Sequence, residues 1–391
     1  MHQMRFDVRE ILRSPRIALS LQRIWIQFLG LTVGFLGYLF FTYLSFITSG
    51  IGLSAAWNKY GLLPCLFPES SPNWYSMIIY FIGVIWLMAV YLIASTAVSR
   101  ATYMLVKENH FYTWTEAIRF ALKKTASILL SPIAILLIIV LLIAGGAIIG
   151  LLGKIPFVGE FGITIFTIAW YFAALVVVFM VIILAVIMLQ TPAIIATTNE
   201  DAFEVVFQSF SLTWSQPWRL ILYEFVSMAM GAIALLVLAF ISKKAYIVMD
   251  RIFANVMGAD FINIAAQGMY ILNVWLIHSI GWVNSILGDF TGAVYFSREF
   301  IPLSLPHSYQ YVASYIFALW MLIIGGIIFS YGLASFNVGN TLSYIILRKK
   351  KDDENLLERK DPEEEDEEDV TEDETEKDSE ETEAKDNSKE S

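Results

Sequence analysis

The chain has 391 residues, of which 57% are hydrophobic and 16% are charged, whereas soluble domains average about half apolar and a quarter charged residues. This composition excludes an ordinary water-soluble domain and indicates a membrane protein. The net charge of −10 combines two unlike regions. Residues 352–391 carry 22 acidic and 5 basic side chains, a net of −17, and residues 1–351 carry 14 acidic and 21 basic ones, a net of +7.

Residues 1–23 form a basic segment that we expect to be retained and to lie in the cytoplasm. The segment is too long and too charged for an ordinary cleaved signal peptide, and Asp7 and Glu10 argue against a transit peptide. The single cysteine of the chain, Cys65, excludes an intrachain disulfide.

Six apolar stretches are each long enough to cross a bilayer, which requires about 20 residues of helix. Alternating strand patterning is absent, and a helix satisfies its own backbone groups in lipid. The sequence therefore predicts an all-α polytopic bundle of three helical hairpins within a transmembrane domain over residues 24–347. The predicted spans are 24–47, 74–99, 127–152, 161–190, 220–241 and 309–334.

Basic residues near the span ends predict a plasma-membrane protein with both termini in the cytoplasm, because cytoplasmic loops of membrane proteins are rich in Lys and Arg. Ten of them are expected to anchor this topology: Arg13, Arg16, Arg23, Arg100, Lys123, Lys124, Arg348, Lys349, Lys350 and Lys351. The opposite loops are poor in basic residues, with Lys59 and Lys154 as single examples. Lys243 and Lys244 conflict with this topology, because it places them outside.

Two similar amphipathic segments follow the second and fourth spans. TWTEAIRFALKKTAS begins at Thr113 and DAFEVVFQSFSLTWS at Asp201, and each has a glutamate three residues after the N-cap, Glu116 or Glu204. The ends of the second, fourth and sixth spans, ATYMLVKEN, TPAIIATTNE and LSYIILRKK, are also alike. We expect an internal repeat with helices along the inner membrane surface; the alternative is the general likeness of amphipathic helices.

The succession of TPAIIA and EVVFQSFSLTW, together with the closing YIILRKKKDD, resembles a broad set of poorly characterised bacterial multi-span membrane proteins. This set includes the membrane portion of some glycerophosphodiester phosphodiesterases. The resemblance covers about residues 75–355 and implies an integral membrane protein from a bacterial host. The phosphodiesterase domain is not in this chain, so the resemblance does not imply that activity.

Residues 242–307 form the predicted outer segment, and within it residues 262–290 are uncharged up to Asp289. Helical spacing groups four polar residues, the fourth being Ser285, into a stripe and places two tryptophans on another side. The candidate lipid-binding residues among them are Asn263, Gln267, His278, Trp275 and Trp282. We expect an interfacial or re-entrant helix. The alternative, a seventh span, would move the basic C-terminal cluster outside.

The sequence contains no recognisable catalytic, phosphate-binding or metal-binding motif. No two of the four histidines are four residues apart, and the spans contain no deep ionisable residue. Glu224 lies about one turn into the fifth span, where we expect it to reach the inner interface or to pair with Arg219. Accordingly, neither an enzyme, nor a cofactor, nor nucleic-acid binding is predicted, and the sequence indicates no oligomeric state.

Small residues recur in two spans, in AGGAIIG (144–150) and in IIGGIIFSYG (323–332). Small side chains allow helix backbones to approach closely in a membrane. We therefore expect close helix packing at both sites.

Residues 348–391 are predicted to be a cytoplasmic, disordered acidic tail, because they contain too few apolar residues to form a core. Two functions follow from the sequence. The first is a non-enzymatic membrane scaffold that binds a cytoplasmic protein partner through this tail or through the inner-surface helices. The alternative is a protein that binds or transports membrane lipids, and an intramembrane enzyme is the third hypothesis.

Overall fold

A computed structural model of the chain describes residues 4–65, 73–276 and 308–359. All regular structure in these residues is α-helical, as the sequence predicted. The helices are α1 (Val8–Ile11), α2 (Ser14–Ala18), α3 (Leu21–Thr48), α4 (Leu53–Tyr60), α5 (Trp74–Val106), α6 (Trp114–Lys123), α7 (Thr125–Leu152), α8 (Val158–Ile165), α9 (Thr167–Thr198), α10 (Ala202–Ser215), α11 (Pro217–Met257), α12 (Ala259–Trp275) and α15 (Ser308–Asp352).

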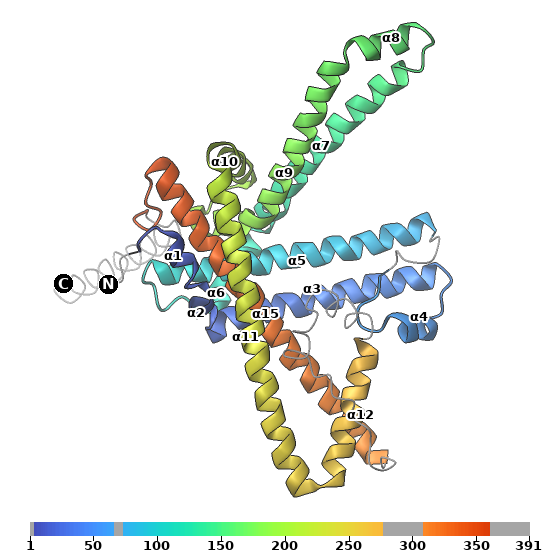
Figure 1. The fold of residues 1–391 in the computed structure, drawn as a ribbon, viewed down its shortest axis with the longest axis vertical. Helices are drawn as coiled ribbons and strands as arrows, with labels where there is room; N and C mark the ends of the chain where they lie inside the picture. Colours follow the sequence, from blue (N-terminus) through green and yellow to red (C-terminus); the bar gives the residue numbers. More distant parts are fainter. Residues whose placement is uncertain (1–3, 66–72, 277–307, 360–391) are drawn as a thin grey trace, which may run out of the picture.

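Six of the described helices, α3, α5, α7, α9, α11 and α15, are long and apolar enough to cross a membrane. They form three antiparallel hairpins, in which α3 pairs with α5, α7 with α9 and α11 with α15 (Figure 1). The prediction of a polytopic helical bundle is confirmed, and the chain has the architecture of a multi-pass membrane protein.

Four long helices continue past the ends of the predicted spans. Polar residues after the apolar stretches set the predicted ends of the spans. In the structure the hydroxyls of such residues donate to the carbonyl four residues before them, and the helices continue. Thr102 Oγ1 donates to the Val98 carbonyl at 2.8 Å, and Thr341 Oγ1 donates to the Asn337 carbonyl at 2.8 Å. The helices α5, α9 and α15 therefore extend beyond the predicted inner ends of their spans.

The three hairpins meet where their second helices end. One continuous stretch of each second helix is buried: residues 94–104 of α5, 190–198 of α9 and 337–347 of α15. These stretches pack against one another and form a common core with the short helices around them. We call this region the hub. It contains the span ends that look alike in the sequence, so their likeness reflects a shared place in the core.

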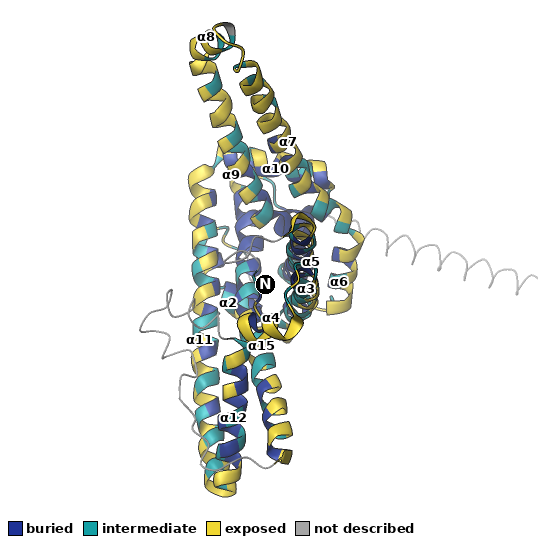
Figure 2. Ribbon diagram, turned by 90° about the vertical axis from the view of Figure 1, so that its right-hand side faces the viewer, coloured by how far each residue is buried: buried dark blue, intermediate teal, exposed yellow. Residues whose placement is uncertain are grey.

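Outside the hub, the hairpins separate and leave in different directions (Figure 1). Figure 2 shows that exposure increases along α7 and α9 toward α8, while buried residues gather at the hub and along α12. The exposed residues of this hairpin are mostly large and apolar, including Leu141, Ile168 and Phe172. Such a surface suits lipid, because its side chains are apolar and its helices satisfy their own backbone groups.

The two short helices predicted after the second and fourth spans are α6 and α10. The capping box of α6 is confirmed: the Glu116 amide donates to Thr113 Oγ1 at 3.4 Å, and the Thr113 amide donates to Glu116 Oε2 at 2.6 Å. In α10 the Glu204 amide donates to Asp201 Oδ1 at 3.1 Å, but the Glu204 side chain accepts a bond from Gln208 instead. Only half of the predicted second box therefore forms.

Helix α10 exposes aromatic side chains along one face. Phe203, Phe207 and Trp214 are exposed, and the Trp214 ring contacts Phe179 of α9 edge-on at a centroid distance of 5.8 Å. Aromatic residues on one side of a short helix are typical of helices that lie along a membrane surface. This arrangement is consistent with the predicted interfacial position of α10.

The predicted outer segment is replaced by two packed helices in its described part. Residues 242–257 continue α11 without a break, and α12 then runs back along α15. Gly268 permits close contact, since a β-carbon there would lie 3.0 Å from the Ser314 carbonyl oxygen. Ser314 Oγ also donates to the Ile264 carbonyl at 3.2 Å. The described part of the segment is therefore packed against α15, and its interfacial or re-entrant position stays a prediction.

Candidate functional site at the hub

Two arginines predicted as membrane-surface anchors are buried inside the hub. Arg100 has no exposed surface; its Nη1 donates to the Ala196 carbonyl at 3.0 Å, and its guanidinium lies over the Phe120 ring at 4.3 Å. Arg23 Nη2 donates to the Ala101 carbonyl at 3.3 Å. Both acceptors lie near the C-terminal ends of long helices, where cations are favourable. These two arginines hold helix ends together, and their part in setting the topology stays a prediction.

The other predicted anchors lie around the edge of the hub. Arg16 and Lys123 are exposed, while Lys124 is half-buried and donates to the Asn199 carbonyl at 2.6 Å. Burial lowers the pKa of the Lys124 ammonium. Contacts of the remaining anchors are with protein groups: Arg13 with Glu10, Lys349 with Asp353, Lys350 with Tyr223 and Asp7, and Lys351 with Asp352.

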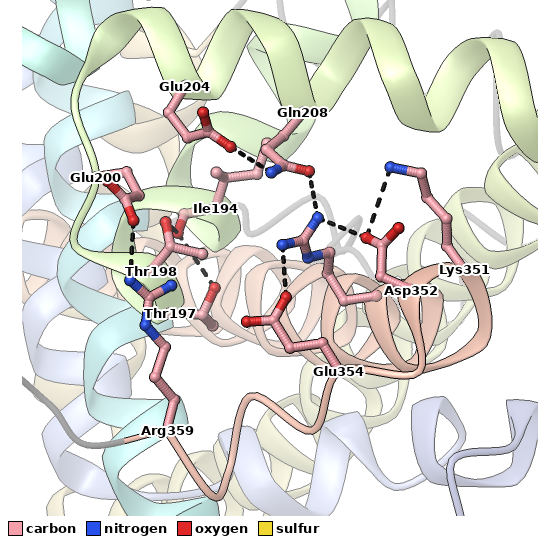
Figure 3. A network of polar contacts seen from close by, with 11 residues as sticks. Ile194, Thr197, Thr198, Glu200, Glu204, Gln208, Lys351, Asp352, Glu354 and Arg359 are labelled. Atoms are coloured by element: carbon pink, nitrogen blue, oxygen red, sulfur yellow. Dashed lines mark hydrogen bonds and ion pairs between the residues drawn. The ribbon is translucent and has the colours of Figure 1, made fainter.

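Arg348 joins α15 to α10 and to the chain that follows α15. Its Nη1 donates to Gln208 Oε1 and to Asp352 Oδ2, each at 2.6 Å, and its Nη2 donates to Glu354 Oε2 at 2.6 Å (Figure 3). Gln208 in turn donates to Glu204. Charge-assisted bonds of this kind are about twice as strong as neutral ones, so the network fixes the end of α15 against α10.

Residues 353–359, which we call the tail root, are seated on the hub. Leu356 is fully buried, and its carbonyl accepts a bond from the Tyr103 hydroxyl at 2.7 Å. Lys107 Nζ donates to the Arg359 carbonyl at 3.1 Å, and Arg359 Nη2 donates to Glu200 Oε1 at 2.9 Å (Figure 3). That bond to Glu200 raises the pKa of the Arg359 guanidinium.

The predicted start of the disordered tail at residue 348 was wrong for residues 348–359. Residues 348–352 belong to α15, and the tail root packs against the hub because Leu356 has an apolar site to fill. Residues 360–391 lie outside the described residues.

Between α3, α5 and α15, the hub contains a buried group of uncharged polar side chains. Asn337 Nδ2 of α15 donates to Gln27 Oε1 of α3 and to Ser95 Oγ of α5, both at 3.0 Å. Gln27 and Ser95 have no exposed surface. Interhelical bonds of this kind specify which helices pair in a membrane. One side chain of α15 thus holds both helices of the first hairpin.

A second polar group joins α9, α11 and α15. Gln190 Nε2 donates to Glu224 Oε1, and Asn340 Nδ2 donates to the Leu189 carbonyl at 3.4 Å. The predicted pairing of Glu224 with Arg219 was wrong: among the described residues, the carboxylate has a hydrogen bond to Gln190 and no ion pair.

The predicted lipid stripe is not assembled in the described part of the chain. Asn263 is buried, Gln267 is half-buried, and the Trp275 ring lies beside that of Tyr315 at 6.4 Å. His278 and Trp282 lie outside the described residues. Since α12 turns Asn263 inward, this residue is not available to lipid.

An apolar groove of about 410 Å³ lies instead on the first hairpin, between α3 and α4. The Tyr43 and Trp57 rings approach each other at a centroid distance of 5.9 Å at its end. The groove is lined by Leu36, Leu39, Phe40, Tyr43, Leu44, Ile47 and Trp57.

Sequence reasoning missed the polar residues that connect the hairpins, namely Gln27, Gln190, Asn337 and Asn340. Gln27 is an amide side chain inside an apolar stretch, and this is a signal that identifies it, because such side chains seek partners across helices. Gln190, Asn337 and Asn340 lie at or beyond the predicted span ends, where other polar residues surround them. In the described residues, no three His, Cys, Asp or Glu side chains lie close enough to hold a metal ion. Comparisons with protein-family models, curated proteins and solved structures gave no match to this chain, so the resemblance stated above stays a prediction.

Proposed function

We propose that the protein is a non-enzymatic membrane scaffold that holds a cytoplasmic partner with a basic surface. The hub faces the cytoplasm of a plasma-membrane protein in this proposal. The basic residues at the hub support this orientation under the positive-inside rule, and α1 and the end of α15 lie on the same side of the molecule (Figure 1).

The seated tail root is the observation that carries the proposal. Because Leu356 and Arg359 are held by the hub, the chain after them starts from a fixed position. Residues 360–391 contain 18 acidic and 4 basic side chains, a net charge of −14. A segment with this charge attracts basic surfaces, and salt weakens the attraction.

The test compares three forms of the protein: the full chain, a chain that ends at Arg359, and a chain in which the order of residues 360–391 is reversed. Native mass spectrometry after gentle extraction measures the stoichiometry of a bound protein. We expect the partner to be lost from the shortened chain and kept by the reversed chain, with less bound at high salt. Equal partner stoichiometry in the full and shortened chains would contradict the proposal.

The apolar groove favours lipid binding as a second function. We propose that it holds one acyl chain of a bilayer lipid, since it opens on a membrane-spanning helix and its lining is almost wholly apolar. Burying apolar surface stabilises binding by about 25 cal/mol per Å². The sequence hypothesis placed lipid at the outer polar stripe, and this proposal places it in the groove.

Leu39→Trp is expected to fill the groove and to remove one tightly bound lipid from the purified protein. The matched control is Leu141→Trp, at an exposed position of α7 outside the groove. Native mass spectrometry counts the retained lipids in each variant. If Leu39→Trp retains as many lipids as the control, the groove is not a lipid site.

A further inference from the structure

The second polar group of the hub contains four buried oxygen atoms that have no hydrogen-bond partner in the described part of the chain. They are Gln190 Oε1, Glu224 Oε2, Ser227 Oγ and Asn340 Oδ1. Gln190 and Ser227 have no exposed surface, and Asn340 is 2% exposed. A buried polar atom without a partner costs about 1–3 kcal/mol, so four in one region need an explanation, and one shared ligand would account for them together.

Contacts between the helices bring these four residues together. Gln190 of α9 is bonded to Glu224 of α11, and Ser227 lies one turn further along α11. On α15, a β-carbon at Gly339 would lie 2.9 Å from Ser227 Oγ, which places α15 directly against this turn. The neighbouring Asn340 donates to the carbonyl of Leu189, the residue before Gln190.

The bonds that the amides make fix the direction of their oxygens. Gln190 must present its NH₂ group to the carboxylate of Glu224, because its oxygen would be repelled there. Asn340 likewise donates its NH₂ group to the Leu189 carbonyl. An amide has one oxygen and one NH₂ group, so both amide oxygens are left for another ligand.

The chemistry of these atoms selects a cation. All four are oxygen ligands, which hard cations prefer, and one belongs to a carboxylate that has no ion-pair partner among the described residues. A proton on Glu224 by itself would leave the other oxygens unpaired, and a water molecule by itself would leave the charge uncompensated, whereas one cation serves both. One carboxylate with three neutral oxygens matches a single positive charge, and buried charges require such compensation.

We propose that Gln190, Glu224, Ser227 and Asn340 form a buried site for a monovalent cation between α9, α11 and α15. The cation would join helices from the second and third hairpins. This site is separate from the tail root and from the acyl-chain groove, so its test is independent of both proposed functions.

The test measures the midpoint of thermal unfolding, Tm, of the full chain in detergent micelles. NaCl or KCl replaces N-methylglucamine chloride at constant ionic strength. A ligand that binds only the folded state raises Tm with its concentration. We expect a saturable rise of about 2–4 °C with at least one of the two cations, and loss of this rise in Glu224→Gln. The control Glu160→Gln, which changes an exposed glutamate of α8, should retain it.

Ser227→Ala supplies a second test that keeps the carboxylate and removes one neutral oxygen. It should raise the cation concentration needed for half of the Tm increase severalfold. An unchanged half-maximal concentration in this variant would overturn the site. A wild-type Tm that is the same in sodium, potassium and N-methylglucamine would also overturn it. This holds even if Tm varies with pH.

Discussion

Replacement of Asn337 by leucine is expected to destabilise the protein by about 2–3 kcal/mol. The change removes the donor that Gln27 Oε1 and Ser95 Oγ share, and it leaves both oxygens buried in the hub without that partner. Leucine is also branched differently from asparagine and must fit the same space. Unfolding by detergent titration in mixed micelles measures the loss.

A double-mutant cycle separates the hydrogen bond from the change of shape. Gln27→Leu combined with Asn337→Leu should be less destabilising than the sum of the two single changes, by about 0.6–1.7 kcal/mol, which runs from the mean to the maximum found for bonds between membrane helices. Asn58→Leu is the control, because Asn58 is exposed on α4 and should respond by less than about 0.5 kcal/mol. Strict additivity in the cycle would contradict the role of this bond.

Gly332→Val is expected to destabilise the protein by about 2–3 kcal/mol through overpacking between α11 and α15. A β-carbon at Gly332 would lie 2.8 Å from Leu235 Cβ, and one at Gly231 would lie 3.0 Å from the Gly332 carbonyl oxygen. Neither helix can accept the added methyl groups without moving. The same detergent titration measures the effect.

The same helix supplies a control for this prediction. Gly325 lies two turns before Gly332 on α15, and a β-carbon there would meet no atom within 4 Å. Gly325→Val should therefore leave the free energy of unfolding nearly unchanged. If both variants are destabilised equally, the loss comes from valine in the helix and not from the contact with α11.

The prediction of close helix packing at the two runs of small residues, 144–150 and 323–332, thus has a different outcome at each run. Gly332 packs against α11, whereas β-carbons at Gly145, Gly146 and Gly150 of α7 would meet no atom within 4 Å. A run of small residues indicates that a close approach is possible, but the neighbour that uses it comes from the tertiary arrangement.

The spans themselves could be predicted because their signal is local: hydrophobic length decides whether a helix crosses a bilayer. The capping box of α6 could be predicted for the same reason, since Thr113 and Glu116 are one turn apart. The half-formed box of α10 shows the limit of this reasoning, because Gln208 competes for the Glu204 side chain.

The hub could not be predicted, because its contacts join residues far apart in the sequence. The charge rule places Arg23 and Arg100 at the membrane surface, but it does not consider carbonyls such as that of Ala196, which becomes an acceptor only after α5 and α9 meet. Likewise, the high charge of residues 352–391 hides Leu356, which is buried in the core, and Leu357, which packs against it.

The chain order determines when the hub can be completed during synthesis. Asn337 and Asn340 lie on α15, the last of the six long helices, so Gln27 and Ser95 leave the ribosome hundreds of residues before their partner. Until then, the earlier hairpins hold polar groups in lipid without the bonds that later connect them. Assembly therefore depends on the final helix, and a chain interrupted before Ser308 cannot close its core.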